Sequence, residues 1–389
     1  MKYTTGILSI RLSRLNISEM SIYHIAPIDS NYNTEILKII QSSPNTTDNL
    51  TVCFDRQPDF FRLAEIRYDP FIYYGYFRLN ELKGLCGIGY HEAMVNGKPD
   101  TVFNIRDYYI SRESRGLGFG LKLSEKFFKD THKNTDTGYV VILAGNKASL
   151  GYIGRRNEAF PFVPYSRIIN QQDVRNIMIV WPVCRSRKYK IRKAHLTDIP
   201  DIVSLLNNEH RERLFGKLYS ADTFQSYLNK RPGLTLDNYY IAMDRDGRSC
   251  GVCAAWDCHE FKQTRVMNYG RRFRLSKVAY KGLSVIFRVP SLPEPGECFK
   301  DIIITDYAVL ERNPEIMNAL LKAVYIEARE NRYQNILFGS SADDPMLKAS
   351  EGFFFQSIIS NIVLVSRDIN KLEPGAVRNH LPYIDIPGL

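Results

Sequence analysis

The chain has 389 residues, of which 44% are hydrophobic, 24% charged and 12% aromatic. These proportions exclude a disordered or collagen-like chain, and the length exceeds the about 100 to 200 residues typical of one domain. The 52 Lys and Arg outnumber the 42 Asp and Glu, giving a net charge of +10. This charge favours an anionic ligand, but the basic residues are scattered, which is more typical of a solvated surface than of a nucleic-acid-binding module.

The apolar stretches are all short. Charged or strongly polar residues interrupt each of them before the roughly 20 residues that a membrane-spanning helix needs. The first 20 residues contain Arg11 and Arg14 and lack the uninterrupted apolar region of a signal peptide. We therefore expect a cytoplasmic protein that does not bind membranes, and the odd number of seven cysteines is typical of reduced thiols.

Two cysteines have the spacing of a metal knuckle. Cys250 and Cys253 lie in the apolar run 250–256, which predicts a strand. Their odd separation would place the two thiols on opposite faces of that strand, and no second pair completes four ligands. The sequence therefore predicts buried thiols and no metal site.

The sequence repeats itself in order, which is typical of two copies of one structural unit. In chain order, the matching segments are 23–25 with 189–191, 36–40 with 202–206, 73–88 with 239–252, 105–110 with 304–309, 117–132 with 315–331, and 140–145 with 336–339. Each copy reads as strand, helix, hairpin, strand, long helix and strand, with Cys86-Gly-Ile88 aligned on Cys250-Gly-Val252. We predict two tandem α/β domains, residues 1–185 and 186–389.

The second copy has a longer link between its hairpin and the strand at 304–309. This link contains Arg271 to Arg274 and the proline-rich stretch from Pro290 to Pro295. It is expected to form a cap or an interface element.

A glycine-rich segment follows the first of these matched strands. Arg115-Gly116-Leu117-Gly118-Phe119-Gly120 stands between the strand ending at Ile110 and a long helix. Glycines cost about 1 kcal/mol each in a helix, so they indicate close approach of the backbone to a ligand, here an anion at a helix N-terminus. A P-loop needs adjacent Gly-Lys and a dinucleotide fold needs GxGxxG, and neither pattern is present.

This segment resembles the signature of the Gcn5-related N-acetyltransferase (GNAT) superfamily, Arg/Gln-x-x-Gly-x-Gly/Ala, through Arg115, Gly118 and Gly120. The resemblance implies that each domain is a mostly antiparallel mixed sheet flanked by helices. It implies that residues 115–120 bind the pyrophosphate of acetyl-CoA or a longer acyl-CoA. It further implies that Tyr109 and Ile110 bind the pantetheine, and that Asn146 also contacts the cofactor.

The second copy departs from this pattern. Aligning Val309 with Ile110 places Pro314 to Asn318 where Arg115 to Phe119 stand, so the glycines are absent. Glu315 would repel a phosphate. We therefore predict that the second domain does not bind CoA in this way and instead supports the first domain or shapes its acceptor cleft.

Acyl transfer to an amine needs a neutral amine and a proton for the leaving thiolate. The resemblance implies Tyr152 as the acid, although it could equally be a packing tyrosine. Asp107 is a candidate base, but its counterpart Asp306 persists in the second copy, which favours a structural aspartate. Glu92 and His91 are alternative bases, and solvent could also accept the proton.

The segment Arg56-Gln-Pro-Asp-Phe-Phe61 resembles one found in other members of this superfamily, on the acceptor side. A helix start with Asp59 near the cap and Phe60 and Phe61 in the core explains it better. The resemblance implies an acyl-CoA-dependent N-acyltransferase, with acetyl as the acyl group and a small-molecule amine or a peptide as acceptor. A non-catalytic acyl-CoA sensor or scaffold and a nucleic-acid-binding module are the alternatives.

Overall fold

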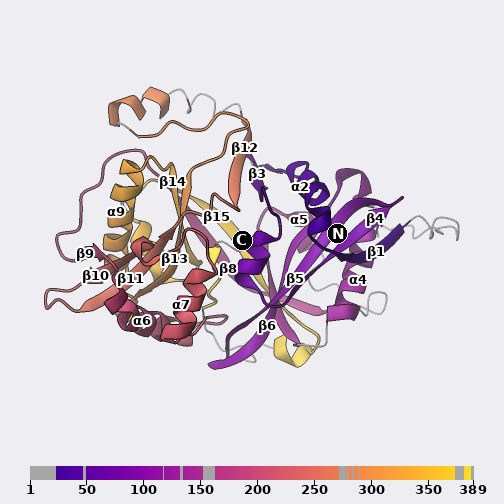
Figure 1. The fold of residues 1–389 in the computed structure, drawn as a ribbon, viewed down its shortest axis with the longest axis horizontal. Helices are drawn as coiled ribbons and strands as arrows, with labels where there is room; N and C mark the ends of the chain where they lie inside the picture. Colours follow the sequence, from indigo (N-terminus) through magenta and orange to yellow (C-terminus); the bar gives the residue numbers. More distant parts are fainter. Residues whose placement is uncertain are drawn as a thin grey trace, which may run out of the picture.

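The computed structural model describes residues 23–46, 50–116, 118–131, 135–151, 163–270, 277, 280–282, 284–287, 289–372 and 381–386. A twelve-stranded sheet runs through the molecule in the order β1-β4-β5-β6-β7-β15-β8-β14-β13-β11-β10-β9 (Figure 1). Its neighbouring strands are antiparallel except for β6 with β7 and β13 with β14, which are parallel. The predicted fold class, a mostly antiparallel mixed sheet flanked by helices, is confirmed.

In the first half of the chain, the strands of this sheet are β1 (Tyr23–Ile28), β4 (Phe71–Arg78), β5 (Glu81–Val95), β6 (Lys98–Ile110), β7 (Thr137–Leu143) and β8 (Tyr165–Met178). In the second half they are β9 (Lys190–Lys193), β10 (Tyr239–Met243), β11 (Ser249–Trp256), β13 (Asp301–Val309), β14 (Asn335–Ser341) and β15 (Phe355–Ser366). The α-helices with printed bounds are α2 (Asn33–Gln41), α3 (Arg62–Arg67), α4 (Phe119–Thr131), α5 (Lys147–Leu150), α6 (Ile199–Arg211), α7 (Ala221–Asn229) and α9 (Pro314–Glu330).

Local sequence patterns explain these elements. The apolar residues Ile36, Ile39 and Ile40 fall on one side of α2 and are buried. The β4–β5 hairpin turns through Leu79 and Asn80, both with positive φ, as the tight turn between antiparallel strands requires. Helices α2 and α3 pack with one face of the first-half strands, while Leu123 of α4 packs with the opposite face.

The last strand of each half lies in the other half. β15 pairs with β7, and β8 pairs with β14, so β8 and β15 run side by side at the centre of the sheet (Figure 1). The two halves therefore share one continuous hydrogen-bonded sheet. The boundary between residues 185 and 186 stays a prediction.

The long link of the second half is an interface element. It contains β12 (Gln263–Tyr269), which pairs with β3 (Leu50–Asp55) of the first half. β3 also pairs with the short β2 (Asn45–Thr46), forming a second sheet. The buried carboxylate of Asp55 accepts a 3.1 Å hydrogen bond from Arg265, which joins the halves again. The segment 271–274 lies outside the described residues.

Strand irregularities correct two sequence-based expectations. The register of β10 with β11 passes from Gly251 to Ser249, so Cys250 is an extra residue at a bulge. Cys250 and Cys253 consequently pack in the same apolar cluster, not on opposite faces as predicted. Within the described residues, no cluster of His, Cys, Asp and Glu side chains could hold a metal.

The hairpin alignment is also corrected. Tyr74 pairs with Cys86, and Tyr240 pairs with Cys253, so the structural counterpart of Cys86 is Cys253 rather than Cys250. The two hairpins have different turns, and the Cys-Gly-aliphatic match in sequence does not survive the shift.

Among the helices that the structure describes, none combines the length and apolar character needed to cross a bilayer.

Candidate active site

Two parallel strands separate in the first half. β6 pairs with β7 at residues 103–105 and 138–140, although β6 continues to Ile110 and β7 to Leu143. Beyond Ile105 the two strands diverge. A wedge between diverging strands exposes backbone donors and acceptors that a ligand can use.

A bulge lies on β6 beside this wedge. Leu85 pairs with Tyr109 and Gly87 with Arg106, so Asp107 and Tyr108 together oppose Cys86. Asp107 has a φ of 50°, which is rare for a residue other than glycine. A bulge places residues outside the ladder and bends the strand, and this one does so directly beside the wedge.

The same bulge occurs in the second half. Val252 pairs with Ala308 and Ala254 with Thr305, so Asp306 and Tyr307 oppose a single residue of β11. Asp306 has a φ of 47°. The match between Asp107 and Asp306 in the sequence therefore reflects one local backbone geometry, present in both halves.

The carboxylate of Asp107 is fully engaged. It accepts hydrogen bonds from Arg106 Nε at 2.6 Å, Tyr73 Oη at 2.8 Å and Arg56 Nη2 at 3.4 Å, and its side chain is 8% exposed. Although burial alone would raise it, the positive charges of Arg106 and Arg56 lower the pKa of Asp107 to about 2. In the second half, Tyr239 and Tyr227 donate to Asp306.

The glycine segment has the backbone expected of an anion site. Gly116 and Gly118 have φ of 79° and 76°, and a Cβ at either would meet no atom within 4 Å. Gly118 directly precedes α4, so amide groups of the first helical turn face the space in front of it. The hydroxyl of Tyr108 donates to the carbonyl of Gly120 and connects β6 to the start of α4.

Of the other residues predicted to bind the cofactor, Arg115 and Asn146 make local contacts within the protein. Arg115 is exposed and donates through Nε to the carbonyl of Ile110 at 3.0 Å, which holds the loop to the strand end. Asn146 is the N-cap of α5, where its side chain accepts from Ser149 N at 3.1 Å. Leu117 and Tyr152 lie outside the described residues, as does the side chain of Phe119.

Two of the candidate bases, Glu92 and His91, lie on opposite faces of β5. Glu92 is exposed and pairs with Thr101, so its side chain points to the opposite face of β5 from that of His91. The ring of His91 contacts those of Tyr68 and Tyr139, and its Nδ1 is buried and has no hydrogen-bond partner within the described part of the chain. Burial, with Lys217 and Arg67 nearby, lowers the pKa of His91 well below its usual value.

The corresponding wedge of the second half is bridged. β13 and β14 pair at 301–303 and 335–337 and then diverge. Tyr307, the counterpart of Tyr108, is buried and donates to the carbonyl of Gly339 at 3.1 Å, thus spanning from one strand to the other. Glu315 forms an ion pair with Lys188 at the start of α9.

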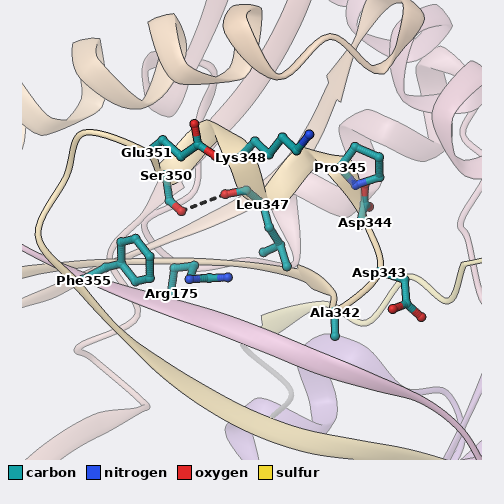
Figure 2. A pocket seen from close by; sticks show the side chains of 10 residues that line it. All are labelled: Arg175, Ala342, Asp343, Asp344, Pro345, Leu347, Lys348, Ser350, Glu351 and Phe355. Carbon is teal, nitrogen blue, oxygen red and sulfur yellow. Dashed lines mark hydrogen bonds between the residues drawn. The ribbon is translucent and has the colours of Figure 1, made fainter.

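A cavity of about 410 Å³ lies beyond the end of β14 (Figure 2). Its charged lining includes Asp343, Asp344 and Glu351 as well as Arg175 and Lys348. Asp344 is engaged by Arg213 and Arg312, and Arg175 by Asp173. This mixed, internally paired lining gives no excess positive charge for a phosphate.

The sequence analysis missed a polar centre where the two halves meet. Asp385, near the C-terminus, accepts from Thr305 Oγ1 at 2.9 Å and from Arg231 Nη2 at 3.3 Å. The backbone carbonyl of Asp385 accepts from Arg67 Nη1 at 3.1 Å. These residues are far apart in the chain, so no spacing rule could have joined them.

Comparison with solved structures finds the fold of N-myristoyltransferase from Saccharomyces cerevisiae. One crystal structure with bound myristoyl-CoA has a TM-score of 0.59 and 11% identity, and the match covers 89% of this chain and 83% of that chain. A second has a TM-score of 0.57, 12% identity, and coverage of 88% and 79%. A GCN5-related N-acetyltransferase from Anabaena variabilis has a TM-score of 0.47, 12% identity, and coverage of 89% and 73%.

No protein-family model and no curated protein matches the sequence. The structural matches define the class by fold: the chain has the GNAT-type fold in the arrangement seen in N-myristoyltransferase. The resemblance drawn from Arg115, Gly118 and Gly120 is thereby confirmed at the level of fold.

Proposed function

We propose that this protein is an acyl-CoA-dependent N-acyltransferase whose first half holds the acyl-CoA. One observation carries the proposal: the strand wedge, the bulge at Asp107 and the glycine segment before α4 occur together in the first half. The second half has the wedge and the bulge, but Tyr307 bridges its strands and its glycines are absent. We therefore also propose that the second half supports the site without binding CoA.

The glycine segment, the wedge and the bulge each suit a different part of acyl-CoA. The open backbone at Gly116 and Gly118, with the α4 dipole, suits the pyrophosphate. The diverging edges of β6 and β7 offer backbone groups to the pantetheine, near Tyr109 and Ile110. The bulge at 107–108 then lies where an amide could donate to the thioester carbonyl.

In the proposed reaction, the neutral amine attacks the thioester carbonyl, the new C–N bond forms and the C–S bond breaks. The ammonium proton passes to a base, and the thiolate takes a proton from an acid. We assign Asp107 a structural role, because three donors occupy its carboxylate. Burial makes the ring of His91 a weak base, so His91, Glu92 and solvent all stay candidate proton acceptors, and Tyr152 stays the proposed acid.

The proposal is tested by CoA binding to two matched variants, measured by calorimetry. Gly118→Glu adds a side chain and a negative charge in front of α4 and should abolish binding. Gly247→Glu is the control, because Gly247 also has a positive φ, 78°, and open space around it, but lies in the β10–β11 turn. Equal CoA affinity in both variants would refute the placement of the cofactor.

Acetyl is the proposed acyl group, and the fold comparison makes acyl length the next measurement. Purified protein is given acetyl-CoA and myristoyl-CoA with a panel of amines and peptides, and released CoA thiol is followed. Acyl-CoA binding without CoA release on any acceptor would favour the sensor or scaffold instead.

A further inference from the structure

Three guanidinium groups converge in the first half, and we call Arg56, Arg67 and Arg106 the guanidinium cluster. Arg56 and Arg106 both donate to Asp107, at 3.4 and 2.6 Å. The guanidinium carbons of Arg67 and Arg106 lie 5.4 and 5.1 Å from the centre of the Tyr68 ring. The cluster thus surrounds one carboxylate and one aromatic ring.

The cluster is buried and carries unused donors. The side chains of Arg56, Arg67 and Arg106 are 7%, 4% and 5% exposed. Among the residues that the structure describes, Arg56 Nη1, Arg67 Nε and Arg106 Nη1 are buried and have no hydrogen-bond partner. Burying a guanidinium N–H group without a hydrogen-bond acceptor costs free energy, so these three nitrogens need further oxygen acceptors.

The charge of the region is also unbalanced. Among the described residues, Asp107 and Asp385 are the carboxylates that form ion pairs with these three arginines, and Asp385 is shared with Arg231 and Lys217. Lys262 Nζ donates to the carbonyl of Ile386 at 3.3 Å. Burial, and after it the positive charges of Arg56, Arg67 and Arg106, lowers the pKa of Lys262 to about 7.

The cluster lies beside the proposed reaction centre. Arg106 directly follows Ile105, the last residue of β6 that pairs with β7, so it stands where the wedge begins. Its partner Asp107 forms the bulge. An anion held by the cluster would therefore lie next to an amine attacking a thioester in the wedge.

We propose that the acceptor carries an oxyanion, a carboxylate or phosphate near its amine, which binds Arg56, Arg67 and Arg106. This inference rests on the proposed acyltransferase function. The planar guanidinium fork suits both anions, and each new bond would be charge-assisted. The same chemistry could instead come from an acyl group with its own carboxylate, and the test separates the two sources.

The first arm uses the wild-type chain, acetyl-CoA and amines that differ in the anion. Tyrosine is compared with tyramine, and phosphoethanolamine with ethanolamine, by CoA thiol release. The anionic member of at least one pair should have about tenfold or higher kcat/KM, as expected when several charged hydrogen bonds are gained. Equal or faster turnover of the amines that lack the anion, tyramine and ethanolamine, overturns the proposal.

The second arm tests the source of the anion. Succinyl-CoA is supplied with tyramine and compared with acetyl-CoA and tyrosine. Preference for succinyl-CoA with tyramine, whose amine has no neighbouring anion, would assign the cluster to the acyl chain and overturn the acceptor assignment.

The third arm needs no turnover and uses inorganic phosphate as the probe, followed by calorimetry. Phosphate can also bind the glycine segment, so Gly118→Glu is used to remove that event. Binding that survives Gly118→Glu and weakens about fivefold or more in Arg67→Gln supports the oxyanion site. If no such phosphate binding is detected, the proposal is overturned.

Folding of the variants is controlled in the same experiment. Arg67→Lys keeps the charge and should retain part of the binding, and Arg187→Gln changes an exposed arginine and should retain all of it. If phosphate binds in this way but no amine gives CoA release, the oxyanion site stands and the proposed acyltransferase function is refuted.

Discussion

Replacing Asp107 by Asn tests whether this carboxylate is structural. The change removes the negative charge between Arg106 and Arg56, whose side chains are 5% and 7% exposed. Breaking a buried ion pair by removing one partner costs about 3–5 kcal/mol, because the remaining charge stays buried. The hydrogen bond from Tyr73 can persist to the amide oxygen, so it adds little to the loss.

Asp306→Asn is the matched control at the same bulge of the second half. Its carboxylate accepts from the neutral hydroxyls of Tyr227 and Tyr239, and an amide oxygen can accept from them as well. Hydrogen bonds to a charged group contribute about 1.5–3 kcal/mol, and the amide oxygen keeps part of this contribution, so we expect a loss of about 1–2 kcal/mol. Asp107→Asn should therefore lower the urea midpoint clearly more than Asp306→Asn.

The assay is urea unfolding at pH 7 followed by tryptophan fluorescence, since Trp256 is buried and Trp181 is partly exposed. The m-values of both variants should equal that of the wild type, so that midpoints report stability. A midpoint for Asp107→Asn equal to that of Asp306→Asn would refute the structural role. Unchanged stability with turnover lost would restore Asp107 as the base.

Two further predictions concern stability. His210 is fully buried, and burial lowers its pKa to about 3, so between pH 6.5 and 3 only the unfolded chain takes up this proton. The free energy of unfolding should therefore fall by about 1.4 kcal/mol for each pH unit of acidification in this range. His210→Gln removes this contribution and should flatten the slope of stability against pH in acid-unfolding curves. A Cβ at Gly251 would lie 2.6 Å from Ile316, so Gly251→Ala should cost about 1–3 kcal/mol in urea unfolding, whereas Gly145→Ala, in open space, should cost far less. An unchanged slope in the first case, or equal losses in the second, would contradict the packing described here.

The matched helices and strands and the open backbone of the glycine segment could be predicted because they depend on nearby residues. Apolar spacing in 36–40 and the turn residues at 79–80 act within a few positions, and the structure has a helix and a hairpin there. The glycines before α4 are likewise local. The hairpin register was not predictable, because the bulge at Cys250 depends on the partner strand.

The sequence by itself determined the order of the matched helices and strands in each half, the burial of Cys250 and Cys253, and the open backbone in front of α4, since each follows from local periodicity or from glycine's freedom at positive φ. Tertiary structure alone decided that β8 and β15 exchange places and that β12 pairs with β3. It also decided that Arg56, Arg67 and Arg106 share one buried site. Long-range strand pairing brings these segments together, and no pattern along the chain records which strands will become neighbours.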